Sequence, residues 1–440
     1  MRLKNDGSSK RAVLITALLF MGLAHIVFFK QYIKGAFFAL IQIVILVNLP
    51  GILLTLYGMI TLGEPNPFVP VTERDHSTFM LIEGVIILAV LGVFFCIYAL
   101  SVRSAVKTYR DYCVMGRLTK NRDSVKEIFN SAFPIFGLAP SLLLVVFFVL
   151  VPLVFAALVS FTNYSSPFHL PPGNTVDWVG FDNYITLFSG ETLWTGALVR
   201  VAVWTLTWAF FATTTCYFGG MLMAVIMKDF KMKFGFIFRL IFILPYAVPA
   251  VISMMVWRNL LHGLGPVNRT LIHFGIIESG LPWLTSVVFV RFTVILVNLW
   301  AGFPYFMLLT MGSMTAINQE LYEAAKIDGA SKFNLFRRIT FPLVTFQTMP
   351  LIIMSFTHNI NNFGAIFFLT GGMSGTPVVM DTPLTSATGV DILVTWIFRL
   401  TMDVRQYHYA AVLAVMIFLV LTPFAIFQFM RTKSFKEGEI

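Results

Sequence analysis

Long runs of apolar residues alternate with short polar stretches along most of this chain. A run of ~20 apolar residues is enough to cross about 30 Å of hydrocarbon as a helix. Eight runs reach that length, at 36–60, 80–102, 138–160, 198–227, 235–258, 287–311, 348–370 and 406–430. A shorter ninth run, 12–29, is interrupted by Gly22 and His25. The pattern predicts an all-α, polytopic membrane protein with about eight transmembrane helices and one N-terminal re-entrant or interfacial segment.

The distribution of charge predicts how these helices are oriented. Segment 103–137 is rich in Lys and Arg, whereas segment 161–197 contains acidic residues and no basic ones. Because positively charged loops stay in the cytoplasm, we expect the first segment inside and the second outside. Counting spans from there places loop 312–347 and both termini in the cytoplasm. If run 12–29 crossed the membrane, the basic N-terminus would lie outside, so we predict that this run does not cross.

These assignments divide the chain into three parts. They are an N-terminal membrane region, 1–135, a main membrane region, 136–435, and a cytoplasmic tail, 436–440. The external segment 161–197 contains Pro171, Pro172 and Gly173. It fits either a small cap over a transport path or a solvated connector.

Composition narrows the class of partner. With 58% hydrophobic and 12% charged residues over 440 positions, the chain is too apolar for a soluble globule. Its net charge of +10 fits cytoplasmic loops in contact with anionic membrane lipid, so we expect lipid and not nucleic acid as a partner. Cys96, Cys113 and Cys216 are isolated in the sequence, so neither a disulfide framework nor a metal site is predicted.

Two of the apolar runs carry polar residues at helical spacing. In 287–311 they are Asn298, Gly302 and Tyr305, and in 348–370 they are Ser355, Asn359 and Asn362, with His358 beside them. Each row follows an i, i+4, i+7 pattern, which places its members on one face of a helix. An unpaired amide in hydrocarbon costs several kcal/mol, of order 2 to 7, so both rows must face protein or a water-filled cavity.

The chemistry of these rows suits a neutral, polyhydroxylated ligand. An Asn amide both donates to and accepts from sugar hydroxyls, and a Tyr ring offers an apolar face to sugar C–H groups. The alternative is that Asn and Ser simply join helices by hydrogen bonds. His358 could exchange protons near neutral pH, but a proton relay usually needs carboxylates at membrane depth, so we interpret it as a ligand or packing residue.

A charged, helix-prone insert, 321–343, separates these two runs. Good helix formers at Glu323, Ala324 and Ala325 are followed by Asp328 and Gly329, and Gly329 permits the positive φ of a sharp bend. Pro342 tends to stop or kink the second helical stretch. The sequence predicts two short helices at an angle, forming either a docking element or a solvated loop.

The spacing of Glu323-Ala324-Ala325, Gly329, Ile339 and Pro342 resembles the cytoplasmic "EAA" loop of ABC-importer permeases. The resemblance implies that Glu323, Ala324, Ala325, Asp328 and Gly329 couple the membrane helices to an ATPase subunit. No G-x-x-x-x-G-K-[ST] phosphate loop occurs in the sequence, so the ATPase must be a separate chain that holds ATP and Mg. We therefore expect this chain itself to bind no cofactor.

Three further stretches are similar to the larger membrane subunit of maltose and maltodextrin ABC importers, and the similarity covers roughly residues 135–435. They begin at Ile241, Asn298 and Ser355. The resemblance implies a permease core over 136–435 and a transmembrane sugar site at Asn298, Gly302, Tyr305, Ser355, Asn359 and Asn362. At Ala301 and His358 this sequence departs from that pattern, which leaves the identity of the sugar open.

The function predicted from these features is that of a permease subunit in the cell membrane of a prokaryote. The resemblance implies a second permease subunit, two ATPase subunits, an extracytoplasmic sugar-binding protein and an oligosaccharide substrate, with maltodextrin favoured. No catalytic or metal-binding group is predicted. The alternatives are a secondary sugar transporter, which would need intramembrane charge, and a membrane-embedded glycosyltransferase, which would use acids such as Asp381, Asp391 and Asp403.

Overall fold

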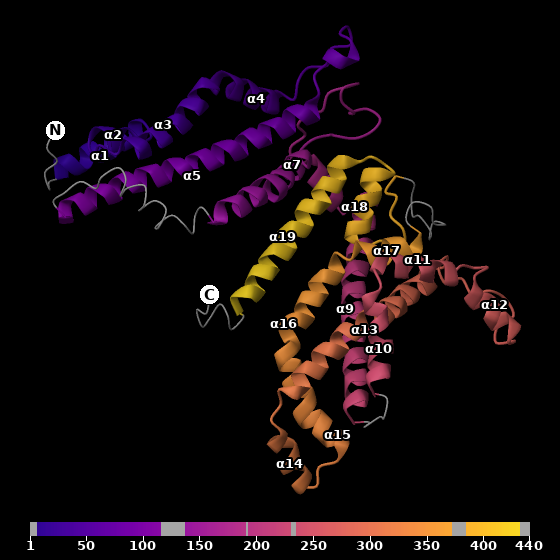
Figure 1. Cartoon of the computed structure of the whole chain (residues 1–440). Coiled ribbons are helices and arrows are strands. Elements are labelled where there is room, and N and C mark those ends of the chain that lie inside the picture. Colours follow the sequence, from indigo (N-terminus) through magenta and orange to yellow (C-terminus); the bar gives the residue numbers. More distant parts are fainter. Residues whose placement is uncertain (1–6, 116–136, 191, 230–234, 372–383, 432–440) are drawn as a thin grey trace. The chain divides into compact units, whose positions relative to one another are not determined.

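The computed structural model describes residues 7–115, 137–190, 192–229, 235–371 and 384–431. Within those ranges the regular structure is helical, apart from two isolated β-bridges in segment 162–178. The predicted all-α, polytopic class is confirmed. The chain divides into two compact units, Met1–Val179 and Gly180–Ile440 (Figure 1).

The first unit is built on three apolar helical stretches. Its helices are α1 (Gly7–Leu19), α2 (Leu23–Val27), α3 (Tyr32–Val47), α4 (Leu49–Thr61), η1 (Val71–Glu73), α5 (Ser77–Met115) and the run 137–159, which includes η2 (Val146–Leu150) and α7 (Val151–Val159). Gly22, with φ +79°, separates α1 from α2, so run 12–29 folds as two short helices instead of one long helix. The Trp178 indole N–H donates to the carbonyl of Ile60 at 2.8 Å, which ties the middle of the external segment to the end of α4.

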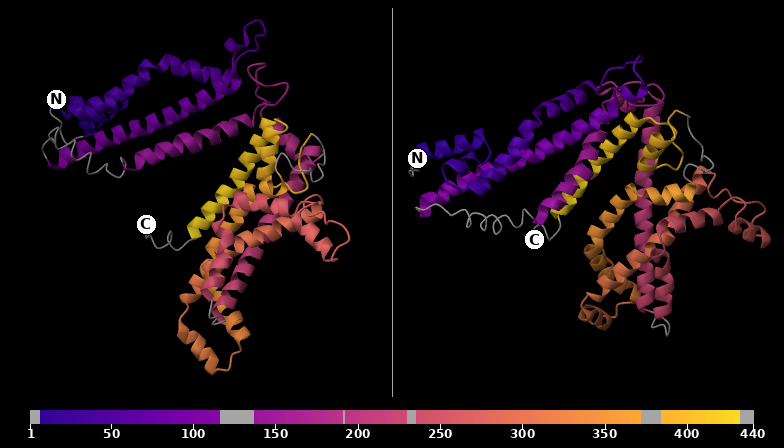
Figure 2. Two further views of the ribbon diagram at one scale, coloured as in Figure 1. Left: turned by 45° about the vertical axis from the view of Figure 1, so that its right-hand side comes forward. Right: turned by 45° about the horizontal axis from the view of Figure 1, so that its top comes forward.

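The second unit holds the remaining helices, and their bounds are as follows. They are α8 (Asp182–Phe188), α9 (Leu193–Asp229), α10 (Gly235–Ala247), α11 (Ala250–Leu260), α12 (Pro266–His273), α13 (Val287–Thr315), α14 (Gln319–Ile327), α15 (Lys332–Leu335), η3 (Phe336–Thr340), α16 (Phe341–Ile360), α17 (Phe363–Thr370), α18 (Leu393–Met402) and α19 (Tyr407–Arg431). Helices α9 and α13 pack together along their length. Within this unit, α14 and α15 lie at one end of this pair, and α11, α12 and α17 lie toward the other (Figure 2).

Within the described ranges, six uninterrupted helices are long and apolar enough to cross a membrane, and two bent pairs bring the total to eight if each pair is one span. The prediction of about eight spans is thus confirmed, but three predicted spans are not single helices. Run 36–60 is the bent pair of α3 and α4, which meet at 54°. The predicted continuous helix 235–258 is instead two helices, α10 and α11, which meet at 93°. Pro245 and Pro249 lack the backbone N–H that a continuous helix would need at these two positions. The prediction that run 348–370 forms one helix is also wrong. The spanning helix is Lys332–Ile360, and α17 follows it as a separate element.

Of the two predicted effects of Pro342, stopping or kinking the second helical stretch of the insert, the first does not occur, because the helix continues through Pro342 to Ile360. The π-helical turn η3 ends at Thr340, two residues before Pro342, and the N–H of Phe341 donates to the carbonyl of Phe336. In this wider turn the backbone N–H bonds to the carbonyl five residues earlier instead of four. The helix can then continue past Pro342, which has no backbone N–H to donate. The same arrangement occurs in the first unit, where η2 precedes Pro152 and the N–H of Val151 donates to Val146.

A buried carboxylate organises the start of α18. Asp391, 2% exposed, accepts hydrogen bonds from the backbone N–H and hydroxyl of Thr388 at 2.8 and 2.7 Å and from the Thr395 hydroxyl at 2.9 Å. The Arg399 guanidinium lies 3.1 Å from the same carboxylate. Asp391 is thus saturated with structural partners, which argues against a role for it as an enzymatic acid. Asp381 lies outside the described residues.

Replacing Asp391 by Ala should destabilise the protein by about 3–5 kcal/mol, because it removes the shorter carboxylate contact of the largely buried Arg399 charge and the shared acceptor of two threonine hydroxyls. The control is Asp403→Ala, since Asp403 pairs with the same arginine at 3.7 Å but is more exposed. For that variant we expect a loss of ~0–1 kcal/mol. Thermal unfolding in detergent measures both, and equal melting temperatures for the two variants would refute the structural role of Asp391.

Candidate functional site

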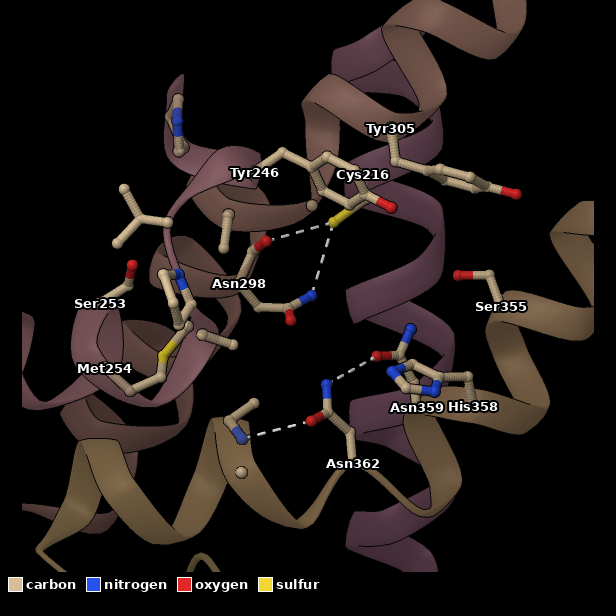
Figure 3. Close-up of a pocket in the computed structure, with 18 of the residues that line it drawn as sticks. Cys216, Tyr246, Ser253, Met254, Asn298, Tyr305, Ser355, His358, Asn359 and Asn362 are labelled. Carbon is tan, nitrogen blue, oxygen red and sulfur yellow. Dashed lines mark hydrogen bonds between the residues drawn. The ribbon is translucent and has the colours of Figure 1, made fainter. Parts of the chain in front are cut away.

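A cavity of about 890 Å³ lies among the helices of the second unit. It is lined by α9, by residues 245–254 at the α10–α11 bend (hereafter the elbow), by α13, and by α16 together with the start of α17. All seven residues predicted to bind substrate line it, namely Asn298, Gly302, Tyr305, Ser355, His358, Asn359 and Asn362 (Figure 3). The structure therefore brings the two polar rows to one space.

The α13 row is held against α9. The Asn298 side chain donates to the Cys216 sulfur at 3.5 Å, and the Cys216 thiol donates to the Asn298 carbonyl at 3.4 Å. A Cβ at Gly302 would lie 2.8 Å from the same sulfur, so a glycine is needed for this close approach. Gly302 thus has a packing role beside its place in the lining, and the buried Cys216 also contacts the cavity.

The second row comes from two helices, not one. Ser355 and Asn359 lie on α16, but α16 ends at Ile360, and Asn362 caps α17 by accepting from the N–H of Ala365 at 3.2 Å. The single i, i+4, i+7 face predicted for this row is therefore wrong for Asn362. Asn362 still reaches the cavity because the break is short, and its amide donates to the Asn359 side-chain oxygen at 3.4 Å.

Asn359 also links α16 to α9. Its side-chain amide donates to the Thr213 hydroxyl at 2.9 Å, and its backbone carbonyl accepts from the Trp208 indole at 3.0 Å. This is the interhelical bonding that the alternative interpretation of the row requires. Asn298 and Asn359 each combine such a bond with a place in the cavity wall, so the two interpretations are not exclusive.

Sequence reasoning missed the elbow as part of the lining. It contributes Tyr246, Ser253 and Met254, among others, and the Tyr246 ring lies 6.1 Å from the ring of Tyr305. In Figure 3, Ser253 and Met254 lie on one side of Asn298, and Ser355 and His358 on the other. Pro245 and Pro249, four residues apart inside an apolar run, were the available sequence indication that the helix bends there.

The lining combines a larger apolar surface with the polar groups of the two rows, and it carries no fixed charge. Among the described residues that line the cavity there is no Asp, Glu, Lys or Arg, and His358 is the one imidazole. Within the described part of the chain, the Ser355 hydroxyl, the Tyr305 hydroxyl and the Asn298 side-chain oxygen make no hydrogen bond. These groups remain available to a ligand that offers both donors and acceptors, which is the property of a hydroxyl-rich neutral molecule.

The charged insert folds as the two predicted helices joined by a tight turn. Asn318 caps α14 by accepting from the N–H of Glu320 at 3.0 Å. At the other end Gly329, with φ +76°, donates to the Lys326 carbonyl at 3.0 Å, and Ala330 donates to Ala325 at 2.9 Å. This pair of bonds is a Schellman motif, in which glycine supplies the left-handed residue. Glu323, Ala324, Asp328 and Gly329 are exposed and Ala325 is half-buried.

The insert is attached to the bundle through Tyr322. Its hydroxyl lies 2.9 Å from the Thr340 hydroxyl in η3, and the Lys228 ammonium, at the end of α9, lies 5.0 Å from its ring. Helix α9 also contacts Asn298 and Asn359 in the cavity. One helix therefore touches both the insert and the two polar rows.

Comparison with known proteins gives a consistent set of relatives. A family model described as binding-protein-dependent transport system inner membrane component matches residues 216–433. The chain is 35% identical over 410 residues to the galactooligosaccharides transport system permease protein GanP of Bacillus subtilis, covering 93% of this chain and 94% of that protein. It is 33% identical over 393 residues to the maltodextrin transport system permease protein MdxF of the same organism, covering 88% and 87%.

Other relatives match a part of the chain. The maltose/maltodextrin transport system permease protein MalF of Yersinia pestis is 34% identical over 269 residues, which cover 60% of this chain and 49% of that protein. Among solved structures, the fold is similar to a chain of a bacterial alginate ABC transporter in complex with an alginate pentasaccharide-bound periplasmic protein. That match has a TM-score of 0.56 and 22% identity, and covers 71% of this chain and 98% of the other.

Proposed function

Since this chain belongs to the inner membrane permease components of binding-protein-dependent (ABC) sugar transport systems, we propose that it conducts a neutral oligosaccharide through the cavity between α9, the elbow, α13 and α16. The observation that carries the proposal is the lining of that cavity. Six polar or aromatic side chains predicted from the sequence, together with Gly302, meet there without a fixed charge. A maltodextrin or a galacto-oligosaccharide, the sugars named for the two relatives above, fits these groups, and maltodextrin is the substrate that we favour.

The proposed importer contains other chains. We propose a second permease subunit, two ATPase subunits that hold ATP and Mg, and an extracytoplasmic sugar-binding protein, with both termini of this chain in the cytoplasm. The exposed residues Glu323, Ala324, Asp328 and Gly329, with Ala325 beside them, would enter the ATPase surface. This chain performs no covalent chemistry in the scheme, because the energy comes from ATP hydrolysed on the partner subunits.

The proposed mechanism is alternating access driven through the insert. Closure of the ATPase pair would move α14, and the contacts of Tyr322 with η3 and with Lys228 would pass that movement to α16 and α9. Because α9 is bonded to Asn298 and Asn359, the two walls of the cavity would shift relative to each other. ATP then selects between two cavity conformations that differ in the side open to solvent.

Reconstitution in proteoliposomes tests this function directly. The complete importer, with its binding protein, should accumulate a labelled maltodextrin only when ATP is supplied to the ATPase side. Vesicles containing this chain alone should accumulate none, whatever ion gradient is applied. Uptake by the isolated chain driven by a proton or sodium gradient would instead establish a secondary transporter, and chemical modification of the sugar would establish an enzyme.

A further inference from the structure

One side of α1 is exposed although most of its residues are apolar. The opposite side is buried, where Val13 and Ala17 share a core cluster with residues of α5. On the exposed side, two lines of side chains recur at four-residue spacing, namely Lys10, Leu14 and Leu18, and Arg11, Ile15 and Leu19. These six residues are hereafter the α1 stripe. Its four apolar members are 38–71% exposed, so each line begins with a cation and continues over two apolar turns.

The contacts between α1 and α5 indicate how deep this stripe lies in the membrane. The Tyr98 hydroxyl donates to the Leu18 carbonyl at 2.6 Å, so the end of α1 meets α5 within its apolar part. Tyr98 lies five residues, ~7.5 Å along the helix, before Arg103, where the basic part of α5 begins. The start of α1 extends toward that basic part, because Val13 belongs to the same cluster as Tyr109. The apolar turns of the stripe therefore lie at the edge of the hydrocarbon, and its cations lie at the level of the lipid headgroups.

The two cations of the stripe have no partner among the described residues. The side chains of Lys10 and Arg11 are exposed and make no ion pair or hydrogen bond there. Helix α1 has 13 residues, about 20 Å, which is too short to cross a bilayer, so this side cannot be explained as one wall of a span. Cations followed by apolar turns match a phospholipid, whose phosphate lies on the water side of its acyl chains. An anionic headgroup also supplies the charge that both cations lack.

We propose that the α1 stripe binds an anionic phospholipid, with Lys10 and Arg11 on the headgroup phosphate and the apolar residues against its acyl chains. In the predicted orientation this lipid lies in the cytoplasmic leaflet, whose negative surface attracts each nearby cation. The inference concerns the first unit alone and depends neither on the sugar nor on the ATPase. It makes run 12–29, which does not cross the membrane, a lipid anchor for the N-terminal unit.

Two matched charge variants test the headgroup contact in the complete importer, purified in detergent and titrated with fluorescent phosphatidylglycerol or phosphatidylcholine. Lys10→Gln/Arg11→Gln should weaken binding of phosphatidylglycerol about 10- to 30-fold and leave phosphatidylcholine unchanged. Arg103→Gln/Arg110→Gln removes two exposed cations from the side of α5 opposite the buried Ala105, and should weaken phosphatidylglycerol less than about threefold, because those cations are remote from α1. Exchanging the two cations, Lys10→Arg/Arg11→Lys, should preserve binding.

The acyl contact and the identity of the occupant are tested separately. Leu14→Ser/Leu18→Ser should weaken both lipids several-fold, since contact with the chains does not depend on the headgroup. Inorganic phosphate should fail to displace phosphatidylglycerol at equal concentration, and a photocrosslinker at Ile15 should label lipid in whole membranes. Equal losses in the two charge variants would show a general attraction of lipid to basic surface and overturn the proposal. Displacement by phosphate, or crosslinking of Ile15 to another subunit of the importer, would also overturn it. Unchanged melting temperatures of the charge variants exclude unfolding as the cause of a loss.

Discussion

Gly329→Asp should abolish sugar uptake while the protein remains in the membrane at its normal amount. The glycine has φ +76° and no atom within 4 Å of an added Cβ, so a side chain there meets no steric obstacle. Asp tolerates the left-handed conformation better than most residues, at a cost of order 1–2 kcal/mol. That is small against a stability of ~5–15 kcal/mol, so the fold should survive. The substitution adds a second exposed carboxylate beside Asp328, on the surface proposed to enter the ATPase.

The measurement is ATP-dependent uptake together with the amount of ATPase that co-purifies. Gly329→Asn keeps the size of the side chain without its charge, and we expect it to retain part of the uptake. Gly275→Asp places the same change at another left-handed glycine, φ +67° with open space around it, far along the chain from the insert, and should transport normally. Full uptake in Gly329→Asp at normal expression would remove the insert from the coupling mechanism.

The number of spans and the faces of α13 could be predicted because both depend on local patterns. An apolar run of sufficient length determines a span, and three residues at i, i+4, i+7 share a face wherever the helix is continuous, as it is through Asn298, Gly302 and Tyr305. The turn at Gly329 was equally predictable, since a glycine after a run of helix formers favours a Schellman motif. Each of these inferences uses only neighbouring residues.

The elbow and the end of α16 could not be predicted in the same way. Hydropathy does not change across Pro245–Pro249, so run length alone concealed a 93° bend. The break after Ile360 moves Asn362 to a new helix although the spacing still reads as one face. At the end of α16 the backbone direction depends on which neighbouring helix satisfies the free polar groups, as Thr213 and Trp208 on α9 do for Asn359. That information is not local to the sequence.

Asn359→Ala should lower the rate of uptake about tenfold without loss of the ATPase subunits from the complex. The substitution removes a cavity amide and also breaks the bond to Thr213 and the acceptor for Asn362. A neutral hydrogen bond contributes ~0.5–1.5 kcal/mol, and an orphaned buried group costs ~1–3 kcal/mol, so the two effects must be separated. Thr213→Val separates them, because it breaks the same bond between α16 and α9 from a residue that does not line the cavity.

If Asn359 only joins helices, any loss of uptake in Asn359→Ala beyond that in Thr213→Val should come with a lower melting temperature, because only Asn359→Ala also removes the acceptor for Asn362. If it also contacts the sugar, Asn359→Ala should reduce uptake further at a similar melting temperature, and the difference measures the sugar contact. Truncating Tyr305 and Asn362 as well should deepen the loss to ~100-fold or more, since each removes a separate contact in a cavity without fixed charge. Normal uptake in this triple variant, with the complex intact, would place the sugar path outside the cavity.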